Sequence, residues 1–397
     1  MFHGRCLIAP DTELDRVAAE ARSRYGSFLS AAIEPFARDR DAKGMSIPRD
    51  AMRSAGELGL LRMAVPEGAG GGGADPVAWG ATLEEIGYLT SDNSFPLLVS
   101  LRVAVTSAIA EIGRGDLQER YVRPMMAGER AGAFAYTDGT DAFSFATTAE
   151  PSGDGFVLRG EKLLVTGGAT ADTFMTYVRD TRTSDLLVFL VDREDAGVEL
   201  RHVEVSGFRS AGLCSLHLED VRVPAHRLMV AADGLGHAQR FLNGRRALLI
   251  CGVVGRMRAI VESCTRALCK TIRYGQPLTD FQNVQATLGR MYIDLEVTRA
   301  IMYRALHRAR KGEADPLFDP VTSAAKYVTI ERALAIAATA MRLLGGQAFR
   351  REFPYERDLR DFTGLVPGAG AQDLLEINLG ERVARRCSHR ENPLEEA

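Results

Sequence analysis

The sequence predicts an α+β protein in which helical segments flank a central β region. Before about position 129 and after about position 233, apolar residues recur every three to four positions, which is typical of helices with one buried face. Between these positions, short alternating segments are separated by Gly, Asp and Thr, which is typical of antiparallel strands. We therefore expect an N-terminal helical domain at 1–129, a middle antiparallel β domain at 130–232 and a C-terminal helical domain at 233–397.

Length and composition exclude several classes of protein. The chain has 397 residues, which is longer than a single hydrophobic core usually supports, so we expect more than one domain. Its net charge of −3 argues against a nucleic-acid partner, which would need a basic surface. No apolar run approaches the roughly 20 residues that span a bilayer, and no secretory signal begins the chain, so we expect no membrane partner. No Cys-x-x-Cys occurs, and cysteines 251, 264 and 269 are expected as buried apolar side chains in a cytoplasmic protein.

The N-terminal region predicts a series of helices. A first helix is expected over 11–39, and a second follows Ile47-Pro48. Asp75-Pro76 predicts the start of another helix, because Asp caps free amides and Pro suits the first turn. Two more helices are expected over 96–112 and 116–127.

The central region predicts short strands that end at Pro224, since Pro cannot donate to a strand ladder. The expected strands are Ala131–Tyr136, Phe156–Leu158, Lys162–Val165, Thr173–Val178, Leu186–Val191, Glu199–Val203 and Leu213–Leu218.

Two long helices follow, joined by a polar connection around Gly275-Gln276-Pro277. Gly permits a left-handed cap and Pro cannot continue a helix, so this tripeptide ends the first of the two. The connection reads Tyr-Gly-x-Pro-Leu-x-x-Phe-Gln-x-x-Gln from Tyr274 to Gln285, and this motif resembles the acyl-CoA dehydrogenase superfamily. Leu58–Gly87, Leu343–Phe349 and Glu352–Asp361 are also similar to segments of that family.

The resemblance covers nearly the whole chain and implies an FAD-dependent oxidoreductase with a C-terminal four-helix-bundle domain. In the family, the β domain binds the flavin ring and a neighbouring subunit completes the site, so a homodimer or homotetramer is expected. The corresponding β-domain positions are Phe134, Tyr136, Thr137, Thr140, Leu164 and Thr166, with a three-residue deletion before Thr140 and Leu164 in place of a usual Trp. The C-terminal positions are Arg273, Tyr274, Leu278, Phe281, Gln282, Gly345, Gly346 and Asp373.

The catalytic base of the family is missing from its expected places. Most members carry a carboxylate at a position that is Ala369 here, and a minority carry it at the position of Arg245. A guanidinium stays protonated and cannot remove a proton, but it can hold a carboxylate by two parallel bonds. We therefore expect Arg245, with Asn243, Arg246 and Arg102, to bind an acidic substrate.

Three functions remain open on the sequence. The first is oxidation of an acidic acyl group on CoA or an acyl-carrier protein, in which loss of CO2 replaces proton abstraction, as in secondary metabolism. The second is a flavin monooxygenase or oxidase on the same fold, for example of the epoxyketone-forming type in natural-product biosynthesis. The third is a non-catalytic homologue that binds a thioester or a partner. Electron-transfer flavoprotein and O2 are the expected alternatives as electron acceptor, and no metal site is expected.

Overall fold

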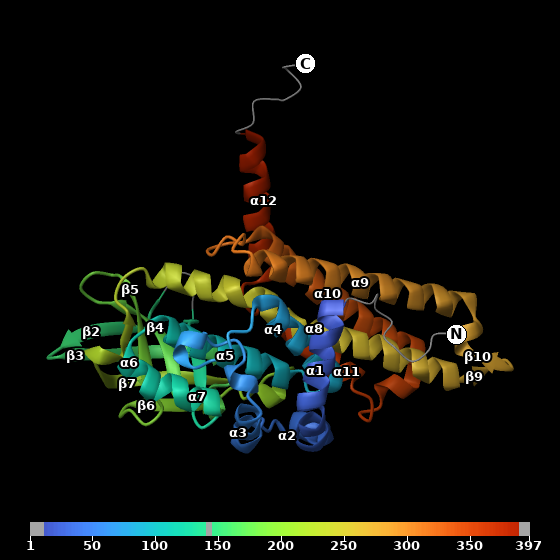
Figure 1. Cartoon of the computed structure of the whole chain (residues 1–397), viewed down its shortest axis with the longest axis horizontal. Helices are drawn as coiled ribbons and strands as arrows, with labels where there is room; N and C mark the ends of the chain where they lie inside the picture. Colours follow the sequence, from blue (N-terminus) through green and yellow to red (C-terminus); the bar gives the residue numbers. More distant parts are fainter. Residues whose placement is uncertain (1–11, 140–144, 389–397) are drawn as a thin grey trace, which may run out of the picture.

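A computed structural model describes residues 12–139 and 145–388 of the chain (Figure 1). The sheet lies at one end of the molecule. The long C-terminal helices run beside the N-terminal helices, and the last helix stands out from the body. The expected α+β architecture, with helical parts on either side of a β domain, is confirmed.

The N-terminal part is helical, but two of the expected helices are interrupted. After α1 the backbone forms a π-helical turn at Leu29–Ile33 and a 3-10 turn at Glu34–Phe36, because Pro35 has no amide for the α-helical ladder. A second π-helical turn, Gln118–Val122, separates α6 from α7. The helices are α1 (Thr12–Phe28), α2 (Ala37–Lys43), α3 (Arg49–Glu57), α4 (Pro76–Leu89), α5 (Ser94–Glu111), α6 (Gly115–Leu117) and α7 (Arg123–Ala127).

One prediction for this part is confirmed and another is wrong. Asp75 caps α4 as predicted, since its Oδ1 accepts from the amides of Val77 and Ala78 at 2.8 and 3.2 Å. Helix α5 is long and apolar enough to span a membrane, with a mean hydropathy of 1.3 over 18 residues, although we expected no such run. Of that window, 78% is buried inside the protein, as in a core helix.

One eight-stranded sheet forms the described β domain, in the order β6-β7-β3-β2-β4-β5-β8, with β1 also paired to β4. Most pairings are antiparallel as expected, but β1 and β2 both run parallel to β4. The two segments expected at 156–158 and 162–165 form one strand, and β2 and β8 were not predicted. The strands are β1 (Gly132–Ala135), β2 (Thr148–Ser152), β3 (Gly155–Val165), β4 (Thr173–Asp180), β5 (Leu186–Asp192), β6 (Val198–His202), β7 (Cys214–Pro224) and β8 (Leu228–Val230).

The C-terminal part is a helical bundle in which α8, α9 and α10 contact one another and α4 packs along α8. Cys251 and Cys264 are buried as expected, but Cys269 is exposed on the last turn of α8. The elements are α8 (Gly234–Lys270), the short hairpin β9 (Ile272–Arg273) and β10 (Gln276–Pro277), α9 (Gln282–Arg310), α10 (Pro320–Leu344), α11 (Tyr355–Gly364) and α12 (Gln372–Ser388).

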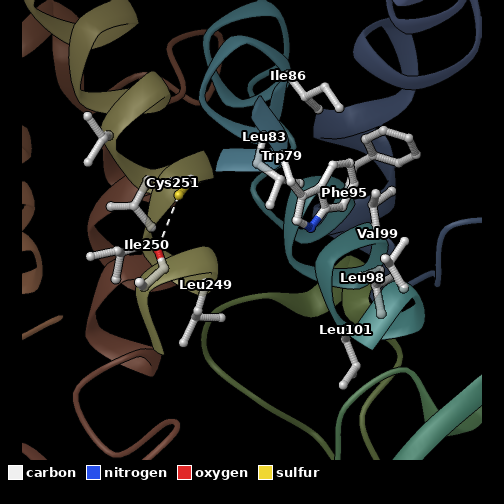
Figure 2. Packing of buried hydrophobic residues seen from close by; sticks show 14 of the residues in the cluster. Trp79, Leu83, Ile86, Phe95, Leu98, Val99, Leu101, Leu249, Ile250 and Cys251 are labelled. Carbon is white, nitrogen blue, oxygen red and sulfur yellow. Dashed lines mark hydrogen bonds between the residues drawn. The ribbon is translucent and has the colours of Figure 1, made fainter. Parts of the chain in front are cut away.

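Helices α4, α5 and α8 share one apolar core. Figure 2 shows Trp79 of α4 and Phe95 of α5 packed together, with Leu249 of α8 nearby. The backbones of α4 and α8 approach closely, because a Cβ on Gly255 would lie 1.8 Å from the Glu84 carbonyl oxygen. Only glycine fits there, so the sequence fixes how near the two helices come.

A buried polar network on α11 joins the three parts of the chain. Asp358 accepts from Arg256 of α8 through both oxygens at 2.8 Å. The amide of Asn93, which precedes α5, donates to Asp358 and Asp361 at 3.0 Å. Asp361 also accepts from the backbone amide of Phe208 in the β domain. Residues from each of the three parts therefore meet at the short helix α11.

Replacement of Asp358 by Ala leaves the Arg256 guanidinium buried without its partner. We expect the free energy of unfolding to fall by about 3–5 kcal/mol, the usual cost of breaking a buried ion pair from one side. Urea denaturation measures this change. Glu20→Ala breaks the exposed Arg16–Glu20 pair and serves as the control, with an expected change within about 0.5 kcal/mol. A loss for Asp358→Ala no larger than the control would contradict the role of the network.

Candidate active site

Two segments of the β domain bring flavin-type contacts to one edge of the sheet. The Leu163 amide donates to the Thr137 carbonyl at 2.8 Å, so the segments after β1 and at the end of β3 lie side by side. Thr137 is exposed, Thr166 is half-buried, and Leu164 is 56% exposed with a left-handed φ of 51°. Two hydroxyls and an outward apolar side chain fit the polar edge and the face of an isoalloxazine. Thr140 lies outside the described residues.

An aromatic column connects this edge to α8. Phe134 stacks on Tyr136 with ring centroids 5.5 Å apart and on Phe241 of α8 at 4.6 Å. Tyr177 packs edge-on against both β1-side rings, and its hydroxyl lies 2.8 Å from Nδ1 of His237. Offset rings at these distances add stability beyond their buried area. The column therefore fixes α8 against the sheet beside the predicted flavin positions.

Beneath this edge lies a buried charge pair that the sequence analysis missed. Lys162 donates to Asp138 and to the Tyr136 carbonyl, while Asp138 accepts from the Thr147 amide at 2.8 Å. Burial lowers the pKa of Lys162 to about 8, although Asp138 partly offsets this effect. The signal available in the sequence was a lysine at an inward position of an alternating strand. The pair holds the segment that carries Tyr136 and Thr137.

Arg245 is a cation without a carboxylate partner in the described part of the chain. Its guanidinium carbon lies 5.1 Å from the Phe241 ring centroid, and its buried Nε has no hydrogen-bond partner there. Burial lowers the pKa of Arg245 to about 10, which still leaves it charged at neutral pH. The Arg245 side chain is half-buried, so a guanidinium without an ion-pair partner is disfavoured here and the site favours an anion that would pair with it.

Arg246 and Asn243 make internal bonds instead. Arg246 donates through Nε to the Ala369 carbonyl at 2.9 Å. Asn243 donates to the Asp315 carbonyl at 2.7 Å and accepts from the Asp319 amide at 3.0 Å. Asn243 therefore positions the turn before α10, and Arg246 positions the turn between α11 and α12. As substrate-binding residues they stay predictions.

The turn that contains Ala369 is also held by Lys326, which the sequence analysis did not single out. Lys326 is fully buried, and its Nζ donates to the carbonyls of Val366 at 3.1 Å and Gly370 at 2.6 Å. Burial and the neighbouring Arg246 lower the pKa of Lys326 to about 8. Ala369 itself has a left-handed φ of 53°. Neither predicted base position carries a carboxylate, and the turn presents backbone held by two cations.

Arg102 lies in a different setting. It is 6% exposed and donates to the Thr170 hydroxyl at 2.9 Å, between α5 and the β domain. Burial lowers its pKa to about 10, with Asp172 acting in the opposite direction. Arg102 and Arg245 share no bonded partner among the described residues, so a role of Arg102 in binding the substrate stays a prediction.

Most of the positions expected to complete the FAD site are exposed, while Leu278 and Phe281 are half-buried. Tyr274 is 96% exposed and packs edge-on against Phe281, with ring centroids 6.3 Å apart. A Cβ on Gly345 or Gly346 would meet nothing within 4 Å. Figure 1 shows the β9–β10 hairpin at the opposite end of the molecule from the sheet. The remaining predicted positions in these segments are Arg273, Leu278, Gln282 and the exposed Asp373 on α12.

Within the described ranges, no group of three or more His, Cys, Asp or Glu side chains is arranged to hold a metal ion. The site therefore consists of hydroxyls, aromatic rings and cations around the junction of the sheet with α8.

Comparison with known proteins agrees with this arrangement. The acyl-CoA dehydrogenase N-terminal, middle and C-terminal domain families match residues 17–129, 133–221 and 232–384. Benzylmalonyl-CoA dehydrogenase of Aromatoleum aromaticum is 27% identical, over 94% of this chain and 100% of that protein. Glutaryl-CoA dehydrogenase of Desulfococcus multivorans is 28% identical, over 94% of this chain and 98% of that protein.

A solved structure, the prolyl acyl carrier protein oxidase AnaB, superposes with a TM-score of 0.87 at 22% identity and covers 94% of this chain and 100% of its own. The likeness to this structure concerns the fold alone. The three domain matches together span most of the sequence in the order in which the structure has its parts. The chain belongs to the acyl-CoA dehydrogenase family and is an FAD-dependent flavoenzyme.

Proposed function

We propose that the protein oxidises an acyl thioester that carries a carboxylate, and that Arg245 binds this carboxylate. The observation that carries the proposal is the Arg245 guanidinium, which belongs to a half-buried side chain with an inaccessible Nε and has no ion-pair partner among the described residues. A bidentate pair with a carboxylate would satisfy it and fix the orientation of the substrate.

Two further cations without a carboxylate partner lie at the turn that contains Ala369. Arg246 and Lys326 lie next to each other, and the carbonyls of the Ala369 turn are their bonded partners. None of these three cations forms an ion pair with a carboxylate in the described part of the protein. Partly buried charges are weakly screened, so Arg246 and Lys326 also favour negative charge at the Ala369 turn.

Decarboxylation offers a route that needs no carboxylate base. When the bond between the α-carbon and the carboxylate breaks, CO2 leaves and its electron pair forms an enolate. Arg245 binds and orients the carboxylate, and the negative charge moves away from its guanidinium as CO2 leaves, so its part in this route is positioning of the substrate. FAD, when bound, accepts the hydride that leaves the β-carbon. The residues here bind and orient the acid, while Thr137, Leu164 and Thr166 would contact the ring.

The names of two relatives support an acidic substrate. Benzylmalonyl-CoA and glutaryl-CoA are both thioesters with a second carboxyl group. We extend this property, but not the identity of either substrate, to this chain. The thioester carrier is CoA or an acyl-carrier protein, and a cytoplasmic location is part of the proposal.

We also propose that two chains share each FAD. The ring-contacting positions lie at the sheet, whereas Tyr274 and the surrounding hairpin lie at the far end of the same chain (Figure 1). A second copy would bring its own Gln282, Gly345 and Gly346 to the phosphates of the cofactor. The exposed Tyr274 and the 83% exposed Phe349 support such burial against a neighbour.

The proposal on the substrate leaves two electron acceptors for the reduced flavin, electron-transfer flavoprotein and O2. An oxidase or monooxygenase is the second candidate, because the missing carboxylate at positions 245 and 369 suits chemistry in which reduced flavin reacts with O2. Consumption of O2 after the flavin has been reduced distinguishes this candidate from a dehydrogenase.

Arg245→Ala should weaken binding of an acidic thioester by about 1.5–3 kcal/mol, the range for a hydrogen bond to a charged group. Arg245→Lys should recover only part of this loss, since an ammonium lacks the planar fork. Anaerobic titration of the flavin spectrum with methylmalonyl-CoA and glutaryl-CoA measures the affinity. The free energy of unfolding should not fall in Arg245→Ala, because a cation without a partner is removed. Native affinity in both variants would make Arg245 structural.

Saturated acyl-CoAs without a second carboxylate should reduce the flavin slowly. Loss of a general base typically costs about 10²–10⁴-fold, and neither Ala369 nor Arg245 supplies one. Stopped-flow mixing with butyryl-CoA and octanoyl-CoA, compared with the acidic thioesters, measures the difference. Rapid reduction by butyryl-CoA would reveal a base elsewhere and contradict the proposed route.

The protein should purify yellow as a dimer or tetramer, and Gly346→Ala should lower its FAD content. The added methyl meets nothing in its own chain, so only an approaching cofactor or neighbour would feel it. Gly289→Ala on α9 is the matched control, because its Cβ also meets nothing within 4 Å. Light scattering and flavin absorbance give mass and occupancy. A colourless monomer that takes up no added FAD would refute the shared site.

A further inference from the structure

We infer that Arg102 is a positioning residue of the flavin site, which holds the turn after Thr166 through Thr170 instead of binding the substrate. This role goes beyond the proposed function, because the reaction route described above makes no use of Arg102. It rests on the proposed contact of Leu164 and Thr166 with the flavin ring, and it is independent of how Arg245 binds an acid.

One face of α5 lies against both segments of the β domain that lead to the predicted ring contacts. Leu98, Arg102 and Val105 recur at helical spacing and share this face. A Cβ on Gly167 would lie 2.8 Å from Leu98 Cδ2, and a Cβ on Gly132 would lie 2.7 Å from Val105 Cγ1. The first glycine follows the end of β3 with its predicted ring contacts, and the second begins β1. Arg102 therefore lies between two points at which α5 already touches the β domain.

The turn after β3 is closed by the Thr170 hydroxyl, and Arg102 sets the direction of that hydroxyl. Arg102 Nη2 donates to Thr170 Oγ1 at 2.9 Å, and Thr170 Oγ1 donates to the Gly167 carbonyl at 3.4 Å. A guanidinium can only donate, so the hydroxyl proton points away from it, toward this carbonyl. The Thr170 amide donates to the same carbonyl at 3.2 Å. Arg102 thereby orients the carbonyl one residue after Thr166.

Further bonds hold the other side of the turn from different elements. Arg193 Nη1 donates to the Ala169 carbonyl at 2.9 Å, and the Ala169 amide donates to the Gly212 carbonyl at 3.0 Å. Neither bond reaches the hydroxyl and carbonyl that Arg102 orients. Loss of the Arg102 bond therefore frees the end of the turn that adjoins the predicted ring contacts, while the other side stays in place.

The carboxylate nearest in charge to Arg102 is bonded to other donors. Asp172 attracts the Arg102 cation, but its two oxygens accept from Arg49 at 2.6 Å and from the Ala131 amide at 2.8 Å. Arg102 forms no ion pair within the described ranges, so Thr170 is its bonded side-chain partner there. A hydrogen bond from a charged donor is stronger than one between neutral groups, which suits Arg102 to fixing this turn.

The test measures FAD binding to full-length Arg102→Met, Thr170→Val and the double variant after removal of the flavin. Each single change should raise the Kd for FAD by about 10-fold, the factor expected for loss of one hydrogen bond to a charged group. The double variant should bind no more weakly than the weaker single variant, because both changes break the same contact. Arg102→Lys keeps a charged donor and should recover part of the affinity. The flavin absorbance spectrum should shift in both single variants.

Thr106→Val is the matched control for loss of a buried hydroxyl. Thr106 lies one turn further along α5, and its hydroxyl donates to the Arg102 carbonyl at 2.8 Å within the helix. Its Kd for FAD should equal that of the native protein, and urea denaturation establishes that every variant is folded. Flavin-loaded Arg102→Met should bind glutaryl-CoA with native affinity, which a residue that binds the substrate would not allow.

Several outcomes would overturn the role of Arg102. Native FAD affinity and a native flavin spectrum in folded Thr170→Val would do so even if Arg102→Met does not fold. Additive losses in the double variant would exclude Thr170 as the intermediary. Weaker binding of glutaryl-CoA to flavin-loaded Arg102→Met would assign Arg102 to the substrate.

Thr166→Val checks the placement of the flavin ring on which this role rests. An unchanged flavin spectrum in Thr166→Val would remove that basis. Oxidation of an acidic thioester is measured by the titrations of the Arg245 variants, so it can fail while the role of Arg102 holds, and the reverse is also true.

Discussion

The bidentate pair between Arg256 and Asp358 is the interaction on which the assembly of this chain depends. Asp358 is fully buried, and α11, which carries it, also bonds the residue before α5 and a loop of the β domain. Burial raises the pKa of the neighbouring Asp361 to about 7, so its charge is retained only with the help of its donors. Because paired charges tolerate little displacement, this network sets the relative positions of α5, α8 and the β domain.

The sequence predicted the architecture well wherever one periodicity persists over many residues. The long helices α8 and α9 and the central strands β4 and β5 have such patterns, whereas β7 runs six residues beyond the segment expected at 213–218. Strand β2 was missed because it contains Pro151 and β8 because it has only three residues. The parallel pairing of β1 and β2 with β4 depends on tertiary contacts between segments far apart in sequence, which no local pattern reveals.

The sequence predicted which types of side chain form the site, but not which groups these side chains bond to. A sequence shows that Arg245 and Arg246 are adjacent cations, yet only the fold shows that Arg246 holds the Ala369 carbonyl. The acceptors of Lys326 are backbone carbonyls, which every residue has and no motif marks. Arg102 was grouped with the others by charge, whereas it bonds Thr170. Backbone acceptors and tertiary neighbours are what single-sequence reasoning cannot see.

Arg245 differs from most other buried charged side chains of this protein, which have bonded partners. Glu84 accepts from Arg299, Glu85 from Arg22 and Arg258, and Asp92 from Arg40. Lys326 and Arg246, which lack carboxylates, are satisfied by carbonyls. Four other buried arginine Nε atoms lack a partner among the described residues, but the guanidinium of each bonds through another nitrogen, whereas no hydrogen bond or ion pair of Arg245 is found there; the four are Arg227, Arg258, Arg308 and Arg357. Such a local cost to stability is typical of binding sites, where the missing partner arrives with the ligand.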